Sequence, residues 1–309
     1  MTEKLPFKVG LVPYELRHER NLAALALSEL EWPRQDQLNR GCIGDLAPED
    51  HVVVYPSSTR LLRSLGPLVC KVDLILAEPL AIQGRYYSML WALRHKFNSI
   101  YCRYGAYASR YSNVHQLAVV ESWVDGTLVN YQAPKTKFCS IIVSAKKDQL
   151  GHVLRHAVVD WSRKYGLNIS VLGRGYQPFQ LKQEGLLPYH YSVVIENVQE
   201  ADYFTEKLLD CILCGTMPIY WGAPNIGDYF DVLGIHICHN YDDLLEVIAA
   251  IASAHRSIHR PTNSPTNRST QRLGPTSEQH FAMDVNRERA LSLSRLKPRI
   301  VDNIYSQGN

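Results

Sequence analysis

The sequence predicts an α/β protein built from two Rossmann-like, doubly wound units in tandem. Short β-branched runs, such as HVVVYP (51–56) and FCSIIVS (138–144), alternate with amphipathic stretches, which is typical of parallel sheets covered by helices. The chain has 309 residues, 46% hydrophobic and 20% charged. This length accommodates two domains of roughly 100–200 residues, each able to bury its own core without a disulfide or metal.

The first half carries four predicted strands, followed by a compositional break. The strands are FKVGLV (7–12), HVVVYP (51–56), VDLILAE (72–78) and NSIYCRY (98–104), with candidate helices at about 60–65 and 87–94. The break is NYQAPKTK (130–137), where a proline and two lysines separate apolar segments. We therefore expect a first domain over 1–133 and a second over 134–255.

The second half repeats the alternation of strands and helices. Predicted strands are FCSIIVS (138–144), ISVLG (169–173), YSVVIE (191–196) and GIHIC (234–238), and predicted helices are 150–166 and 242–255. A further helix and strand follow within 205–222. Residues 256–280 are poor in apolar side chains and are predicted to be an exposed or disordered loop, and 281–309 a C-terminal helical tail.

Charge and cysteine usage exclude several classes of protein. The formal net charge of +3 comes from dispersed Lys and Arg, so no nucleic-acid partner is expected. No apolar run reaches the roughly 18 residues of a membrane span. The seven cysteines are an odd number, lie mostly in apolar runs and follow no secretory signal. We therefore expect a reduced, cytoplasmic location and leave the oligomeric state open.

Chemistry-bearing residues gather between 195 and 222. Glu196 and Asn197 follow a continuous apolar strand, and ligands bind at the carboxyl edge of open α/β sheets. Thr205 is a good helix cap, and the first turn of that helix offers free N–H groups to an anion. A carboxylate such as Glu206 can hold ribose hydroxyls, and Lys207 adds a positive charge for phosphate.

Structural explanations compete with these roles. The macrodipole alone favours Glu206 in a first helical turn, and a lysine beside it is most often solvated. Cys211 and Cys214 lie three apart on an apolar helix and suit core packing better than zinc. His152 and His156 lie four apart on a predicted helix, but the sequence shows no third ligand to complete a metal site with them. No metal site is therefore expected.

The stretch YHYSVVIENVQEADYFTEKLLDCILCGTMPIYWGAPNIGDYF (189–230) resembles the donor-binding segment of family 10 glycosyltransferases, the α-1,3/1,4-fucosyltransferases. Their pattern is an aromatic-rich strand ending in Glu-Asn, then Asp/Gly-Tyr-x-Thr-Glu-Lys, then Pro-(Ile/Val)-x-x-Gly. Order and spacing agree over about 40 positions, which is more specific than any short motif alone. Ile195 replaces the usual Phe before Glu-Asn, and the resemblance extends over roughly residues 135–240.

The resemblance implies a GT-B fold, in which two Rossmann-like domains face a cleft and the second holds a GDP-sugar. It places Arg155 and Lys207 on the diphosphate and Glu206 on the ribose. The full donor-binding set is Arg155, Glu196, Asn197, Tyr203, Thr205, Glu206 and Lys207. The expected reaction is an inverting transfer of fucose, or a related sugar, to a saccharide hydroxyl without a metal or other cofactor. The alternative is a catalytically silent GDP-sugar binder of the same fold.

The first half departs from the family pattern at the general base. Family members carry a glutamate after a strand of the amino-terminal domain, in a context such as Gly-Glu-Asn, whereas this chain has VDLILAEPLAIQGRYY. Glu78 follows an apolar strand and precedes Pro79, so a position at the carboxyl edge of the sheet suits a base. A structural role at the strand end is the alternative, and Glu121 is the competing carboxylate.

Overall fold

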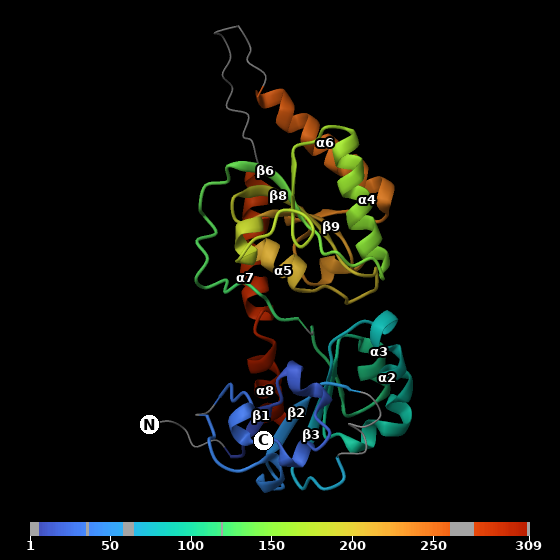
Figure 1. Cartoon of the computed structure of the whole chain (residues 1–309), viewed down its shortest axis with the longest axis vertical. Coiled ribbons are helices and arrows are strands. Elements are labelled where there is room, and N and C mark those ends of the chain that lie inside the picture. The colour runs from blue at the N-terminus through green and yellow to red at the C-terminus, as the bar shows by residue number, and fades with distance from the viewer. Residues whose placement is uncertain (1–5, 35–36, 58–64, 119, 260–274, 308–309) are drawn as a thin grey trace. The chain divides into compact units, whose positions relative to one another are not determined.

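The computed structural model describes residues 6–34, 37–57, 65–118, 120–259 and 275–307 (Figure 1). The chain divides into two compact units: unit 1 is Met1–Val119 together with Arg295–Asn309, and unit 2 is Val120–Ser294. By this division, the predicted boundary between 133 and 134 lies inside unit 2, and the predicted tail 281–309 contributes to both units.

Unit 1 contains a five-stranded parallel sheet in the order β1-β2-β3-β4-β5. The strands are β1 (Val9–Leu11), β2 (His51–Val54), β3 (Lys71–Leu76), β4 (Ile100–Cys102) and β5 (Val114–Gln116). Three of them, β1, β2 and β4, lie within predicted strands, and β3 begins one residue before the predicted strand 72–78. The fifth, β5, was not predicted, because Val114 is its only buried residue and the segment has no apolar run.

Helices cover both faces of the unit 1 sheet, which explains why its strands are apolar without alternation. Val52 and Val54 of β2 pack into a core with α2 (Leu80–Leu93), whereas Val53 packs with α8 (Leu296–Gln307). A short helix, α3 (Gly105–Arg110), connects β4 to β5, and the predicted helix at 60–65 lies almost wholly outside the described residues. The last helix of the chain therefore completes the first unit.

Four short 3-10 turns lie among the described residues of the long connection between β1 and β2. Their bounds are Tyr14–His18, Leu22–Ala24, Leu27–Glu29 and Ile43–Asp45. Leu22, Leu27 and Ile43 from these turns are buried in the same core as β2 and α2.

Unit 2 contains a second five-stranded parallel sheet, in the order β10-β9-β8-β6-β7. The strands are β6 (Lys137–Ile142), β7 (Ile169–Leu172), β8 (Tyr189–Ile195), β9 (Met217–Trp221) and β10 (His236–Ile237). Strand β8 is central and pairs with β6 on one side and β9 on the other. The residues that follow β8 therefore lie in the middle of the carboxyl edge of the sheet.

Figure 1 shows α4 (Leu150–Lys164) and α6 (Tyr241–His259) on one side of this sheet, and α5 (Glu206–Leu213) and α7 (Ser277–Leu293) on the other. Val158 of α4 and Leu244 of α6 share one core with β6, β8 and β9. The predicted loop 256–280 was wrong at both ends, because residues 256–259 belong to α6 and 277–280 to α7, and its residues 260–274 fall outside the described residues. No helix in the described part of the chain is long and apolar enough to cross a membrane.

Candidate functional site

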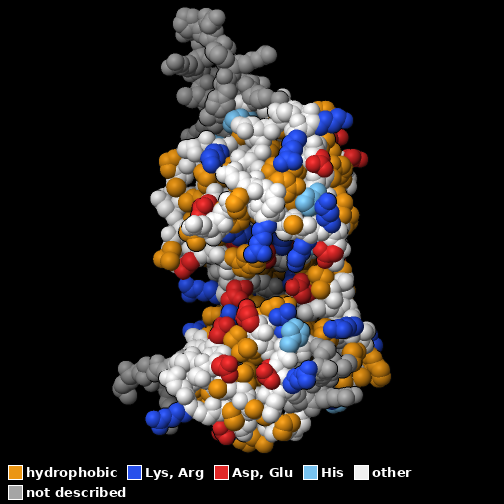
Figure 2. Space-filling view, viewed as in Figure 1, with side chains coloured by type: hydrophobic (Ala, Val, Ile, Leu, Met, Phe, Trp, Pro, Cys, Tyr) orange, Lys and Arg blue, Asp and Glu red, His pale blue; other side chains and the backbone are white. Residues whose placement is uncertain are grey.

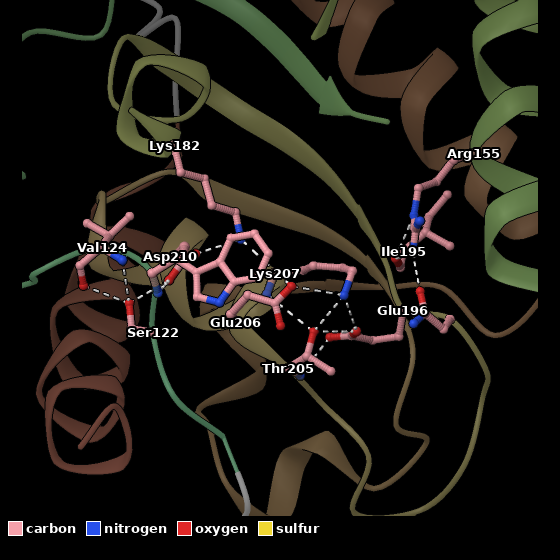
Figure 3. Close-up of polar contacts among 12 residues, drawn as sticks. Ser122, Val124, Arg155, Lys182, Ile195, Glu196, Thr205, Glu206, Lys207 and Asp210 are labelled. Carbon is pink, nitrogen blue, oxygen red and sulfur yellow. Dashed lines mark hydrogen bonds and ion pairs between the residues drawn. The ribbon is translucent and has the colours of Figure 1, made fainter. Parts of the chain in front are cut away.

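Glu196, the first residue after β8, connects the end of that strand to the start of α5 (Figure 3). Its side chain is fully buried. The carboxylate accepts hydrogen bonds from the backbone N–H of Thr205 (2.9 Å) and from the Thr205 hydroxyl (2.7 Å). Because both carboxylate oxygens bind Thr205, Glu196 fixes the orientation of the start of α5.

Thr205 is the N-cap residue of α5, as its type predicted. Its hydroxyl oxygen accepts hydrogen bonds from Lys207 N (3.3 Å) and from Lys207 Nζ (3.0 Å). The cap therefore both begins the helix and positions the lysine side chain.

The turn before α5 depends on a backbone conformation that few residues adopt. Asp202 has φ of 63°, in the left-handed region that favours Gly and tolerates Asp. Its N–H donates to Asn225 Oδ1, and its carboxylate accepts from Asn225 Nδ2 and the Tyr229 hydroxyl, each at 2.8 Å. These contacts hold the turn that brings Tyr203 and Thr205 to the sheet edge.

The Lys207 ammonium lies between two carboxylates. Nζ is 3.1 Å from Glu206 Oε1 and 3.7 Å from Glu196 Oε2. Burial lowers the pKa of Lys207, but attraction to Glu196 and Glu206 outweighs burial, and the pKa is raised. Its side chain is 25% exposed, and contacts with both carboxylates hold the charge in place.

Glu206 has a second cation nearby. Its Oε1 lies 3.9 Å from Lys182 Nζ in addition to the contact with Lys207. Burial raises the pKa of Glu206, but attraction to Lys207 and Lys182 is stronger and the pKa is lowered. The carboxylate is thus ionised at neutral pH and able to accept hydrogen bonds from hydroxyl groups.

Arg155, on α4, is buried and hydrogen-bonded to the protein itself. Its Nε and Nη2 donate to the carbonyl oxygen of Ile195 at 3.0 and 2.7 Å, and Nη2 also donates to Asn197 Oδ1 at 2.9 Å. Burial lowers the pKa of the guanidinium from its usual value. Arg155 therefore secures the end of β8, and its role as a phosphate ligand remains a prediction.

Asn197 and Tyr203 complete the predicted donor set. The carbonyl of Asn197 accepts from Gly151 N at 2.9 Å, so the first turn of α4 lies directly on this segment. A Cβ at Gly151 would approach the Glu196 carbonyl oxygen to 1.7 Å, which explains the glycine. Tyr203 is almost fully buried, at 1% exposure, and any donor contact by its ring requires local opening.

Sequence reasoning missed a second charged cluster beside this site. Lys182 begins a 3-10 turn (Lys182–Gly185), and its Nζ is 2.6 Å from Asp210 Oδ2 on α5. Burial raises the pKa of Asp210 despite attraction to Lys182. One sequence signal existed, because Asp210 is the single acid in the apolar run LLDCIL; nothing in the sequence marked Lys182. Figure 2 shows Lys and Arg side chains gathered over α5.

Glu78 is the second residue after β3 in unit 1, beyond the carboxyl end of the strand as predicted. Its N–H donates to Gln83 Oε1 at 3.2 Å, and its carbonyl accepts from the Tyr87 hydroxyl at 3.5 Å. Its side chain is partly exposed, whereas the competing Glu121 is exposed in the first segment of unit 2. The backbone of Glu78 is thus well held, and its role as a base remains a prediction.

Potential metal ligands have other partners. His152 Nδ1 lies 2.9 Å from Asp148, and His156 Nδ1 lies 2.8 Å from the Tyr176 hydroxyl. Cys211 and Cys214 are buried in the core, as expected. Among the described residues, no group of three or more His, Cys, Asp or Glu side chains is arranged to hold a metal ion.

Solved structures establish the class of fold. An α1,3-fucosyltransferase structure covers 99% of this chain and 93% of its own, with 14% identity and a TM-score of 0.55. A UDP-forming α,α-trehalose-phosphate synthase from Burkholderia vietnamiensis covers 84% of this chain and 72% of its own, with 10% identity and a TM-score of 0.50. The fold is that of GT-B glycosyltransferases, with a parallel α/β sheet in each unit.

The family match is confined to unit 2. Residues 132–237 match the model described as glycosyltransferase family 10 (fucosyltransferase), C-terminal part, which confirms the predicted resemblance over this segment. The α-(1,3)-fucosyltransferase FucT of Helicobacter pylori is 34% identical over 70 residues, 22% of this chain and 15% of that protein. The α-(1,3)-fucosyltransferase B of Drosophila melanogaster is 30% identical over 98 residues, 28% of this chain and 21% of that protein. The matches therefore span a small part of each relative.

Proposed function

We propose that this protein is an inverting glycosyltransferase that moves fucose, or a related sugar, from a GDP-sugar to a saccharide hydroxyl. The observation that carries the proposal is the pair Glu206 and Lys207 at the N-terminus of α5, on the carboxyl edge of the unit 2 sheet. The pair lies inside the segment that matches family 10. Fucose is supported as the sugar by the two relatives, which are both α-(1,3)-fucosyltransferases.

In the proposed complex, Glu206 accepts hydrogen bonds from the ribose hydroxyls. Those bonds replace the contact of Glu206 with Lys207 Nζ, now 3.1 Å, and leave the ammonium available to a phosphate oxygen. The positive end of the α5 dipole adds attraction for the same anion. Arg155 is the third source of positive charge. As the anomeric C–O bond breaks, negative charge grows on the leaving GDP, and these fixed groups stabilise it.

The acceptor hydroxyl attacks the anomeric carbon on the face opposite to the leaving GDP, so the configuration inverts. The new C–O bond forms as the bond to the diphosphate breaks, and the hydroxyl proton goes to a carboxylate base. We assign this base to Glu78, on its position at the carboxyl end of β3.

The proposed mechanism uses side-chain cations and a helix N-terminus as the groups that neutralise the diphosphate. We therefore expect full turnover in excess chelator. Turnover that disappears with chelator and returns with manganese would contradict this part of the proposal.

A cytoplasmic location also remains a prediction, supported by seven cysteines that are all free thiols.

Calorimetry with GDP, combined with a turnover assay, tests the function. The assay uses GDP-fucose with a panel of galactose and N-acetylglucosamine acceptors, and donor hydrolysis is followed in parallel. We expect GDP binding and release of GDP from the donor. Tight GDP binding without turnover on any GDP-sugar would instead favour the silent binder, an alternative motivated by the divergent first half of the chain.

A further inference from the structure

Trp123 is a large aromatic side chain that the protein holds in place and yet leaves exposed. Its relative exposure is 74%, whereas the adjacent Val124 is buried at 3%. The backbone N–H of Trp123 donates to Asp210 Oδ1 at 3.1 Å, and the Ser122 hydroxyl donates to the same oxygen at 2.5 Å. Because Asp210 is fully buried on α5, the segment that carries the indole is anchored to that helix.

One face of the indole is covered by a cation that also contacts the candidate donor site. Lys182 Nζ lies 4.6 Å from the centre of the Trp123 ring and 3.9 Å from Glu206 Oε1. The ring centre and the Glu206 carboxylate are therefore at most 8.5 Å apart, through their shared ammonium neighbour. Lys182 lies over one face of the ring. Because the Trp123 residue is 74% exposed, the other face of its ring is open to solvent.

We propose that the open face of Trp123 is the stacking platform for the guanine base of the donor. The inference rests on the proposed function, because it takes Glu206 as the residue that holds the ribose. Base and ribose are joined by one glycosidic bond, so their binding groups must be close neighbours, as Trp123 and Glu206 are. A planar aromatic ring is also the side chain on which nucleobases stack.

The ammonium beneath the ring favours this use. A cation over an indole face attracts the electron density of the ring, and Lys182 itself is fixed by the ion pair with Asp210 at 2.6 Å. The opposite face then meets an electron-rich purine with little rearrangement. The indole, the ammonium and the ribose-holding carboxylate thus form one nucleoside subsite along the side of α5.

The test compares Trp123→Ala and Trp123→Phe with wild type by titration calorimetry, using GDP and inorganic pyrophosphate. Base stacking on an aromatic side chain is worth about 1–3 kcal/mol, which predicts a GDP Kd raised about 5- to 150-fold in Trp123→Ala. We expect a smaller loss in Trp123→Phe and unchanged pyrophosphate binding in both. Trp91→Ala is the matched control, because Trp91 is a 67% exposed tryptophan of unit 1, and its GDP affinity should equal that of wild type.

Each other outcome has a distinct meaning. Wild-type GDP affinity in Trp123→Ala would overturn the stacking role while leaving the proposed function intact; exposed Trp123 would then be a candidate protein contact. Equal losses for GDP and pyrophosphate would also overturn it, because the diphosphate has no base to stack. If wild type itself binds no GDP, the proposed function fails, and the inference fails with it.

Discussion

The Glu196 carboxylate binds both the backbone N–H and the hydroxyl of Thr205, at 2.9 and 2.7 Å. This relationship ties the end of the central strand to the cap of α5 without a ligand. Since Lys207 Nζ also lies 3.7 Å from Glu196, the same buried acid keeps a cation at the helix start. An arrangement of this kind needs little reorganisation when an anion binds.

Lys207→Met should weaken GDP binding. It removes a charge-assisted contact worth about 1.5–3 kcal/mol, or roughly a 10- to 150-fold rise in Kd. Thermal stability should also fall, because Glu196 then lies buried without its cation. Calorimetry measures the first effect, and Lys164→Met, at an exposed lysine, is the control. An unchanged Kd would remove Lys207 from the donor site.

Arg155→Lys should lower both GDP affinity and stability, and Arg155→Ala should do so more strongly. Lysine keeps the charge but cannot donate from Nε and Nη2 together to the Ile195 carbonyl. We expect a loss of about 1.5–3 kcal/mol in the free energy of unfolding for Arg155→Ala, measured in urea. Unaltered stability would mean that the end of β8 is held by other contacts.

Glu78→Gln should keep GDP affinity and lose turnover. The amide preserves size but cannot accept the proton, and a positioned base contributes about 10²–10⁴ in rate. Glu121→Gln is the matched carboxylate control and should change turnover little. A Glu78 variant with full turnover would move the search for the base to Glu121 or Glu196.

Lys182→Met should destabilise the protein by about 3–5 kcal/mol, because it leaves the buried Asp210 without its cation. The double variant Lys182→Met, Asp210→Leu should recover part of this loss, since it removes both charges together. A urea-denaturation cycle of wild type, the two single variants and the double variant gives the coupling energy. Additive effects would show that the ion pair contributes no coupling.

Acid should weaken the contribution of Glu206. Its pKa in the folded protein is lowered from the usual 4.5, chiefly by Lys207 and Lys182 against the effect of burial. Because its pKa is lower in the folded state, the Glu206 carboxylate stabilises the fold at pH values above its unfolded pKa. This contribution is lost as the pH falls through the folded-state pKa. The difference in unfolding free energy between wild type and Glu206→Gln should therefore shrink from about pH 7 to about pH 3.5. A pH-independent difference would contradict this.

Local signals in the sequence were enough for most of the elements and for the start of α5 at the centre of the candidate site. Strand β8 is a continuous apolar run. Helix α5 begins where the cap residue Thr205 precedes Glu206 and Lys207. Adjacent residues therefore determine the strand and the start of the helix. The same locality explains one omission, because β5 has only Val114 as a buried residue and owes its position to pairing with β4.

The tertiary structure alone decided which distant residues complete the site. Lys182 meets Asp210, Ser122 bonds to an acid 88 positions away, and the buried hydrogen bonds of Arg155 bridge 40 positions to Ile195. The position of α8 on the sheet of unit 1 was settled in the same way. The physical reason is that burial and charge pairing depend on the spatial order of strands and helices, whereas caps and apolar runs depend only on adjacent residues.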